Sequence, residues 1–396
     1  MTSTLAVDGG TPTRTAPFPT WPVYDDTEEK ALLSVLQSGR WGSTSGEVVA
    51  RFAEEFCRFQ GAAYGVPVAN GTLALVAALR AAGVGPGDEV IVTPYTFIAS
   101  ASSVVLSGAV PVFVDVLPDT LLIDPGAAAA AITPRTKAIM AVHIAGCPCD
   151  MDALLDVAGA HGISVVEDAA QATGAEWRDR RVGAIGDIGT FSFQSSKNMT
   201  AGEGGIIVTD DAALADRAWS LANVGRSRQG AWYQHDIIGW NLRLTEFQAA
   251  ILRAQLGRVP QQASVRSRNA TELTARLNDI PGVTPLRVDD RVTAHGWHLY
   301  VVQLAGGLDK QSFLRALTAE GVPCSAGYVT LNRNEALRDA ARAAAGDPSL
   351  TFTDCPVAQS AERNVAWMPQ NILLGDSADV ADVADAVAKV AGALTP

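Results

Sequence analysis

The sequence predicts an α/β protein built on a largely parallel β-sheet with helices on both faces. Short apolar runs rich in β-branched residues alternate with Ala-rich helical segments between residues 71 and 210. These runs are continuously apolar, which is typical of strands buried on both faces. The length of 396 residues exceeds what one core usually organises, so we expect two unequal domains.

The elements follow one another in a regular order. Asp25 and Asp26 open an amphipathic helix that Gly39 closes, and a second helical pattern spans Val48–Gln60. The predicted strands are 89–94, 110–116, 137–143, 163–169, 187–194 and 204–210. The predicted helices around the first four strands are 71–82, 98–107, 124–131 and 150–161.

The regular alternation of predicted strands and helices ends at about residue 245. A long helix is predicted from Thr245 to about Leu277, with a kink expected at Pro260, and an Ala/Val-rich helix over 377–394 ends the chain. We therefore expect a large domain over residues 1–250, which includes the N-terminal helical segment, and a smaller C-terminal α+β domain over 251–396.

Composition excludes several classes of protein. The net charge is −12 and no run of Lys or Arg appears, which argues against nucleic acid as a partner. The most apolar stretch, 98–116, is interrupted by serines, Pro111 and Asp115, so it predicts no membrane span. Five sparse cysteines without metal-ligand spacing, and no visible signal peptide, predict a cytoplasmic protein with free thiols and no metal site.

Lys197 stands out among the polar residues. It follows the strand 187–194 within SFQSSKNMTAGEGG, surrounded by small residues and glycines, with no acid in the five residues before it. Burial at such a place lowers the pKa of a lysine, and the neutral amine is the form that attacks an aldehyde. Alone, the motif also fits a surface lysine on a flexible loop.

Glu167 and Asp168 end the predicted strand 163–169. Ligands of open α/β sheets bind at the carboxyl ends of strands. Because adjacent strand residues point to opposite faces, only one of the two is expected to face a site while the other serves the structure. A carboxylate there suits the protonated ring nitrogen of pyridoxal phosphate, although an Asp that caps the next turn is also common.

Two further motifs complete a set. Asn70, Gly71 and Thr72 open a helix whose free N–H groups could bind phosphate, and Phe97 follows a strand at a position from which it could stack on a flat cofactor. Each motif alone also fits an ordinary helix cap or a core residue. Together they match one cofactor, pyridoxal 5'-phosphate.

At these motifs the chain resembles the DegT/StrS-type sugar aminotransferases, which are fold-type I pyridoxal-phosphate enzymes. The blocks that carry the resemblance are VGPGDEVIVTPYTFIAS, VFVDV, AVHIAGCPCDMDAL, VVEDAAQATGA, FSFQSSKNMTAGEGG and GWNLRLTEFQAAIL. Within the family, SFQSSKNMTAGEGG and CPVAQSAERNVAWMPQNILLG look most like the cyclitol (scyllo-inosose) aminotransferases and the aminohydroxybenzoate synthases. The resemblance implies a large domain with a mostly parallel seven-stranded sheet between helices and a smaller C-terminal domain.

The resemblance also implies a role for each matching residue. Lys197 forms the Schiff base with the cofactor and acts as the general base, Asp168 pairs with the pyridine nitrogen, Gln171 lies near the ring 3-hydroxyl, and Phe97 stacks on the ring. The residues implied to hold the phosphate are Gly71, Thr72, Ser192 and Asn241. In the family this asparagine comes from the neighbouring subunit, which implies a homodimer with shared sites.

The implied reaction is transamination in natural-product biosynthesis. An amino-acid donor, glutamine or glutamate, gives its amino group to the cofactor, and the pyridoxamine 5'-phosphate form then aminates a keto-sugar or keto-cyclitol. Lysine at 197 favours transamination over the related dehydratases, which carry histidine there. Residues 326–330 lack the HYPxPLH-like block of many nucleotide-sugar enzymes, and Tyr328 and His298 are our candidates for substrate contact.

Three alternatives stay open at this point. An aminohydroxybenzoate-synthase-like enzyme would dehydrate and aromatise a ring ketone with the same cofactor and lysine. A non-catalytic regulator would keep the fold and the cofactor without turnover. A nicotinamide dehydrogenase is disfavoured, because the glycines at 83–87 precede a strand instead of linking a strand to a helix.

Overall fold

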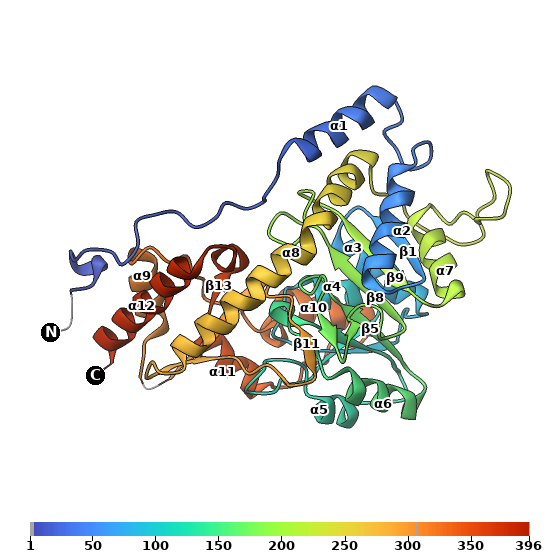
Figure 1. Cartoon of the computed structure of the whole chain (residues 1–396). Helices are drawn as coiled ribbons and strands as arrows, with labels where there is room; N and C mark the ends of the chain where they lie inside the picture. Colours follow the sequence, from blue (N-terminus) through green and yellow to red (C-terminus); the bar gives the residue numbers. More distant parts are fainter. Residues whose placement is uncertain (1–3, 306, 396) are drawn as a thin grey trace.

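A computed structural model describes residues 4–305 and 307–395. Within this part of the chain, seven strands form a central sheet, as the sequence analysis predicts (Figure 1). In spatial order they are β1 (Tyr64–Val68), β9 (Gly205–Thr209), β8 (Ile188–Ser192), β5 (Ser164–Asp168), β4 (Thr136–Val142), β2 (Glu89–Val92) and β3 (Val110–Phe113). Strands β8, β5, β4, β2 and β3 are parallel, and β9 runs antiparallel to both of its neighbours.

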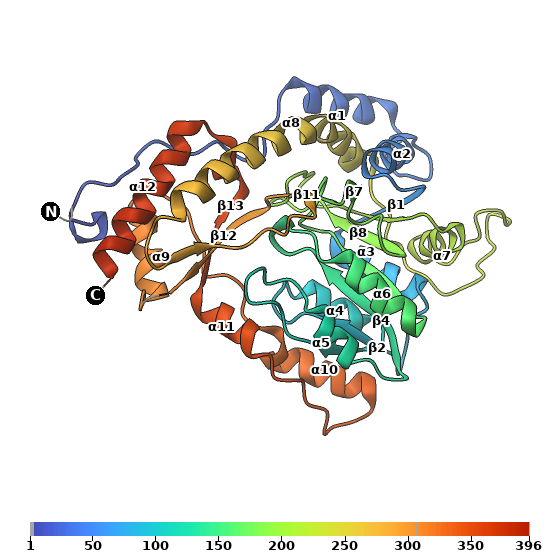
Figure 2. The same ribbon diagram turned by 60° about the horizontal axis from the view of Figure 1, so that its bottom comes forward.

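Helices cover both faces of this sheet. Val90 and Val92 of β2 join one core, whereas Ile91 between them joins another, as the alternation of side chains along a strand requires. The first core packs against α3 (Gly71–Ala81), α4 (Ala99–Leu106) and α7 (Ala212–Ala222). The second packs against α2 (Val48–Gln60), α5 (Pro125–Ala130), α6 (Met151–His161) and the first half of α8 (Glu246–Leu277) (Figure 2).

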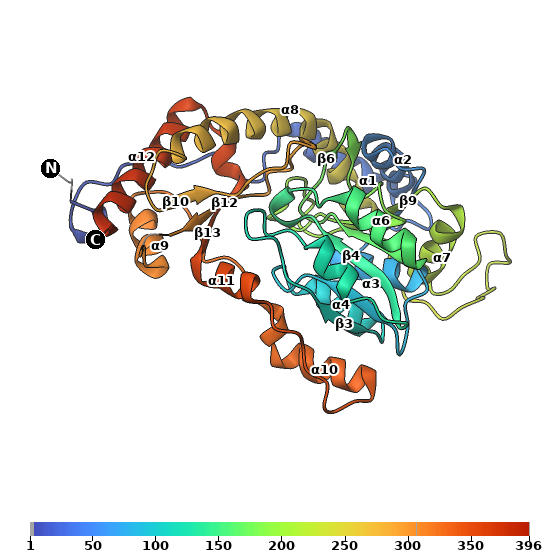
Figure 3. The same cartoon turned by 90° about the horizontal axis from the view of Figure 1, so that it is seen from below.

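A third core lies at the far end of α8. The antiparallel strands β10 (Val283–Pro285), β12 (Leu299–Leu304) and β13 (Val365–Pro369) pack there with α9 (Lys310–Ala319) and α12 (Ser377–Leu394). Figure 3 shows α8 spanning the molecule between this group and the central sheet. The division at residue 250 stays a prediction. The predicted kink at Pro260 does not interrupt the helix, which is continuous from Glu246 to Leu277.

The remaining elements connect these layers. α1 (Asp26–Ser38) lies along α8, and α10 (Glu335–Ala345) packs on α4 and β3. The small sheet of β11 (Val292–Ala294), β6 (Glu176–Trp177) and β7 (Arg180–Arg181) joins the two halves of the chain. Other short elements are α11 (Pro356–Asn364) and the 3-10 helices η1 (Ala6–Asp8), η2 (Ile144–Gly146), η3 (Leu331–Arg333) and η4 (Gln370–Leu374). No helix among the described residues is long and apolar enough to cross a membrane.

Candidate active site

The predicted site residues meet at one cavity of about 670 Å³ at the carboxyl ends of β5 and β8. The predicted residues that line it are Gly71, Thr72, Phe97, Asp168, Gln171, Ser192, Lys197, His298 and Tyr328. Asn241 is the exception: it is exposed, pairs with Asn223 beyond the end of α7, and does not line the cavity. The residues that line the cavity thus come from segments far apart in the sequence, between Asn70 and Tyr328.

Lys197 lies in the loop that follows β8. The Lys197 N–H donates to the carbonyl of Gln194 at 2.9 Å, and the Gln194 side chain accepts from the N–H of Ser196 at 2.8 Å, which forms a tight turn. Burial lowers the pKa of Lys197 to about 8, although the negative charge of Asp168 acts in the opposite direction. About a tenth of such an amine is neutral at pH 7, so it can attack an aldehyde.

Asp168 is a buried carboxylate held by two donors. Its Oδ2 accepts a hydrogen bond from the Ser100 hydroxyl at 2.7 Å, and its Oδ1 accepts one from the N–H of Ala170 at 3.2 Å. Ser100 belongs to α4, on the same side of the sheet as the cavity lining at Phe97. A carboxylate fixed in this way can hold a proton on a heteroaromatic nitrogen.

Glu167, the neighbour of Asp168, serves the structure instead. His143 Nε2 lies 3.0 Å from the Glu167 carboxylate, and both side chains are fully buried. The backbone N–H groups that donate to Glu167 belong to Gly183, Ile185 and Gly186. Burial raises the cost of ionising Glu167, but these hydrogen bonds outweigh it and lower its pKa. Glu167 thus secures the loop before β8, while Asp168 faces the cavity.

Gln171, Tyr328 and His298 form one wall of the cavity. Gln171 accepts a hydrogen bond from the Ala145 N–H at 2.7 Å and donates one to the Tyr328 hydroxyl at 2.9 Å. The carbonyl of Ala145 in turn accepts the backbone N–H of His298 at 2.9 Å. Ala145 thereby ties the C-terminal part of the chain to the end of β4.

The first turn of α3 forms another wall. The Asn70 side chain caps the helix by accepting the N–H of Leu73 at 2.9 Å, which leaves the N–H groups of Gly71 and Thr72 available to an anion. A Cβ atom at Gly71 would lie 2.6 Å from the Cβ of Ser192, so only glycine allows this helix to start beside the Ser192 hydroxyl. Phosphate can bind between these donors.

The groups present fit pyridoxal phosphate. A lysine of lowered pKa, a buried carboxylate and a helix start beside a hydroxyl line a single cavity large enough for a ligand of drug size. Phe97, whose side chain is 55% exposed at the cavity, offers an aromatic face. The fold and these groups define a pyridoxal-phosphate-dependent aminotransferase.

The comparisons with known proteins give the family. Residues 22–388 match the DegT/DnrJ/EryC1/StrS aminotransferase family, and the chain belongs to it. The chain is 42% identical to the L-glutamine:2-deoxy-scyllo-inosose aminotransferase of Streptomyces kanamyceticus over 98% of this chain and 97% of that protein. It is 40% identical to the 3-amino-5-hydroxybenzoate synthase of Amycolatopsis mediterranei over 95% of this chain and 99% of that protein.

Solved structures agree with this assignment. The crystal structure of a 3-amino-5-hydroxybenzoic acid synthase superposes with a TM-score of 0.90 at 38% identity, over 96% of this chain and all of that one. The fold expected from the resemblance is confirmed, as are the aminotransferase class and the cofactor.

The sequence analysis did not identify two residues that support the site, Ser100 and Asn198. Ser100 lies 68 residues from the carboxylate that it holds, and Asn198 lies 100 residues from His298, its hydrogen-bond partner. Nothing local distinguishes the serine of an Ala/Ser-rich helix. For Asn198, its position directly after Lys197 was the available signal.

Proposed function

We propose that this enzyme transfers the amino group of L-glutamine or L-glutamate to the ketone of a cyclitol or sugar in natural-product biosynthesis. The observation that carries the proposal is the buried Lys197 amine, with a pKa lowered to about 8, in one cavity with Asp168. The relatives at 40–42% identity that are named for L-glutamine and scyllo-inosose derivatives support the donor and the ring ketone.

Different residues of this chain bind the cofactor and move the proton. When bound, pyridoxal phosphate supplies an aldehyde for the lysine and a ring that accepts electrons from carbon. Asp168 holds the proton at the ring nitrogen, and Gly71, Thr72 and Ser192 hold the phosphate. With the cofactor bound, Nζ of Lys197 would take the proton from the α-carbon of the amino donor and would return it to the carbon of the cofactor that receives the amino group. Gln171, fixed by Ala145 and Tyr328, orients the ring through its 3-hydroxyl.

The complete site is proposed to need two copies of the chain. Asn241 is exposed outside its own cavity, and the preceding loop displays Trp232, Tyr233 and Ile238 with 70%, 83% and 93% of their surfaces exposed. Large apolar side chains exposed in one loop suit an interface between proteins. In a homodimer this loop would carry Asn241 toward the phosphate in the partner's site.

The direct test supplies the purified holoenzyme with L-glutamine and 2-deoxy-scyllo-inosose and follows the amine product by mass spectrometry. Borohydride reduction followed by peptide mapping should place the cofactor on Lys197. A label on another residue would refute the assignment of Lys197. A holoenzyme that aminates no ring ketone from glutamine or glutamate would refute the proposed function.

The second candidate is an enzyme that dehydrates and aromatises an aminated ring ketone. It is favoured by the TM-score of 0.90 with 3-amino-5-hydroxybenzoic acid synthase. Aromatisation creates a new ultraviolet chromophore, whereas simple amination does not. The same reaction followed by absorbance and mass spectrometry therefore separates the two candidates.

A further inference from the structure

His298 occupies a special place between two cavities. It lines the Lys197 cavity and also an adjoining cavity of about 350 Å³ that reaches Trp21 and Trp367. Its backbone is fixed by the hydrogen bond to the Ala145 carbonyl, and its residue surface is 6% exposed. The backbone hydrogen bond and this burial together restrict the movement of the imidazole ring.

The hydrogen bonds of His298 define its tautomer. Asn198 places one side-chain atom 2.5 Å from the carbonyl oxygen of Gly296, and that atom must be the Nδ2 donor because two acceptors would repel. The Oδ1 of Asn198 therefore faces His298 Nδ1 at 3.1 Å as an acceptor. Nδ1 carries the hydrogen, and Nε2 of the neutral ring is left with a lone pair.

The surroundings keep this ring neutral. Burial lowers the pKa of His298 well below its usual value, and the positive charges of Lys197 and Arg266 lower it further. Arg266 is itself buried, and its Nε donates to Gln370, a residue that lines the adjoining cavity. Nε2 forms no hydrogen bond with any residue of the described chain, so it is the acceptor that His298 offers to a ligand.

We propose that Nε2 of His298 accepts a hydrogen bond from a hydroxyl group next to the ketone of the ring substrate, and so selects ring ketones that carry such a hydroxyl. This inference rests on the proposed function. A lone pair beside Lys197 repels the carboxylate of the amino donor and the ketone oxygen, since both are acceptors. A ring hydroxyl is a donor, and polyhydroxylated rings carry one close to the reacting carbon.

Two substitutions of His298 test the roles of its two ring nitrogens separately. In His298→Asn the shorter amide replaces Nδ1 and keeps the partner Asn198, but it removes the acceptor at Nε2. In His298→Gln the longer amide places its oxygen where Nε2 was. We expect His298→Asn to lower kcat/KM for 2-deoxy-scyllo-inosose in the ketone half-reaction by about 10- to 100-fold, and His298→Gln to recover most of that loss. The glutamine half-reaction should change by less than about threefold in both, because the donor amino acid does not use Nε2.

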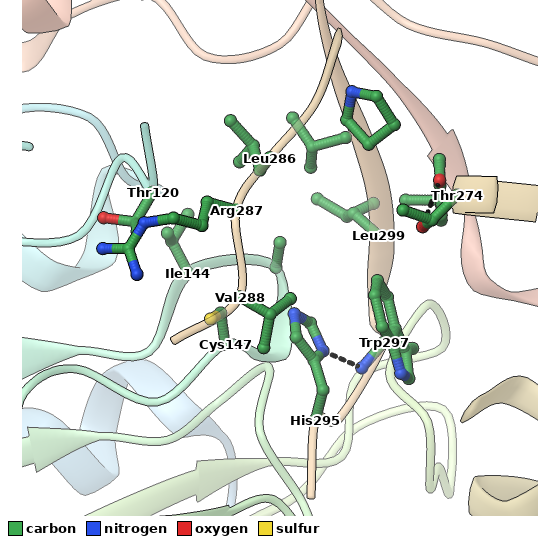
Figure 4. Close-up of a pocket in the computed structure, with 14 residues that line it drawn as sticks. Thr120, Ile144, Cys147, Thr274, Leu286, Arg287, Val288, His295, Trp297 and Leu299 are labelled. Carbon is green, nitrogen blue, oxygen red and sulfur yellow. Dashed lines mark hydrogen bonds between the residues drawn. The ribbon is translucent and has the colours of Figure 1, made fainter. Parts of the chain in front are cut away.

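His295 provides the matched control. It lines a separate pocket of about 20 Å³ with Trp297, where it is half-buried, and its Nδ1 accepts the N–H of Trp297 at 2.8 Å (Figure 4). In His295→Asn the amide oxygen can keep that contact, so this variant carries the same change of side chain without touching the Lys197 cavity. Both half-reactions should stay within about threefold of the parent enzyme.

A second measurement reads the tautomer without any turnover. Nitrogen-15 NMR of the histidine-labelled holoenzyme, assigned with His298→Asn, should show Nδ1 protonated and Nε2 bare at pH 7. A protonated Nε2 would overturn the proposal even if the variants lose activity. An equal loss in both half-reactions, or no loss in the ketone half-reaction, would overturn it as well. If the parent enzyme aminates no ring ketone, the proposed function fails while the NMR result still tests the state of His298.

Discussion

The two walls of the Lys197 cavity are built in different ways. The cofactor wall consists of strand ends and one helix start: Asp168 and Ser192 end β5 and β8, and Gly71 begins α3. The opposite wall consists of irregular segments before β12 and before η3, which present His298 and Tyr328. The backbone of the first wall is secured by the regular hydrogen bonding of strands and a helix. The second wall depends on isolated hydrogen bonds, such as that from the backbone N–H of His298 to Ala145 and that between the side chains of Gln171 and Tyr328. This difference suits an enzyme that holds one cofactor and admits different substrates.

We expect the largest effect from removing the amine of Lys197, which lies in the cofactor wall. Lys197→Ala should reduce transamination by at least about 10³-fold, because it removes both the attachment point and the proton carrier. Lys197→Arg should be equally inactive, since a guanidinium stays protonated. Turnover of glutamine with the ring ketone gives the measurement, and circular dichroism verifies the fold. Normal transamination by either variant would contradict the role of Lys197.

The next largest effect concerns the carboxylate. Asp168→Asn keeps the shape and an acceptor for Ser100 but removes the charge, so we expect a loss of about 10²-fold in kcat. Ser100→Ala is the matched partner, because it leaves the charge and removes one hydrogen bond. It should cost only about 5- to 10-fold. Steady-state kinetics measure both, and equal losses would show that geometry outweighs charge at this position.

The contrast between the walls also explains what the sequence could reveal. Strand ends of a parallel sheet share one edge, so position predicted a site near Lys197 and the Glu167–Asp168 pair, with only one of the two carboxylates facing it. The choice of Asp168 over Glu167 came from the family resemblance. Strand β1 was missed because Gly65 and Pro67 weaken its pattern. It lies at the edge of the sheet, where proline is tolerated.

The second wall carries no such positional rule. Gln171 and Tyr328 are 157 residues apart, and their hydrogen bond follows from tertiary packing that no local pattern encodes. Tyr328 entered the prediction only through the family resemblance, and its network with Ala145 required the structure. Resemblance could also imply a role for Asn241, but one chain alone does not bring that residue to the cavity.

A third prediction tests whether Asn241 of the partner subunit contributes to binding of the cofactor phosphate. Asn241→Ala should weaken cofactor binding by about tenfold, since one phosphate contact is lost. At a cofactor concentration well below the weakened Kd, Asn241→Ala dimers are largely empty, and mixing them with Lys197→Ala subunits should restore about a quarter of the parental activity after subunit exchange, because half of the dimers are then mixed and each has one intact site. Activity and mass by light scattering provide the measurement. Absence of restoration in proven mixed dimers would show that Asn241 does not act across the interface.

The smallest expected effect is the pH dependence with which Lys197, in the cofactor wall, captures the cofactor. Burial lowers the pKa of Lys197 from 10.5 to about 8, so its neutral fraction rises as pH rises through 8. The rate at which the cofactor-free protein captures pyridoxal phosphate should therefore increase about fivefold from pH 7 to pH 8 and level off above pH 9. Stopped-flow absorbance measures this rate, and the same profile for a lysine model peptide gives the reference, which keeps rising toward pH 10. A capture rate that follows the peptide would mean that burial does not tune this amine. In that case the polar loop after β8 would have to be solvated before the cofactor arrives, and the rigid cofactor wall would form only around the bound ring.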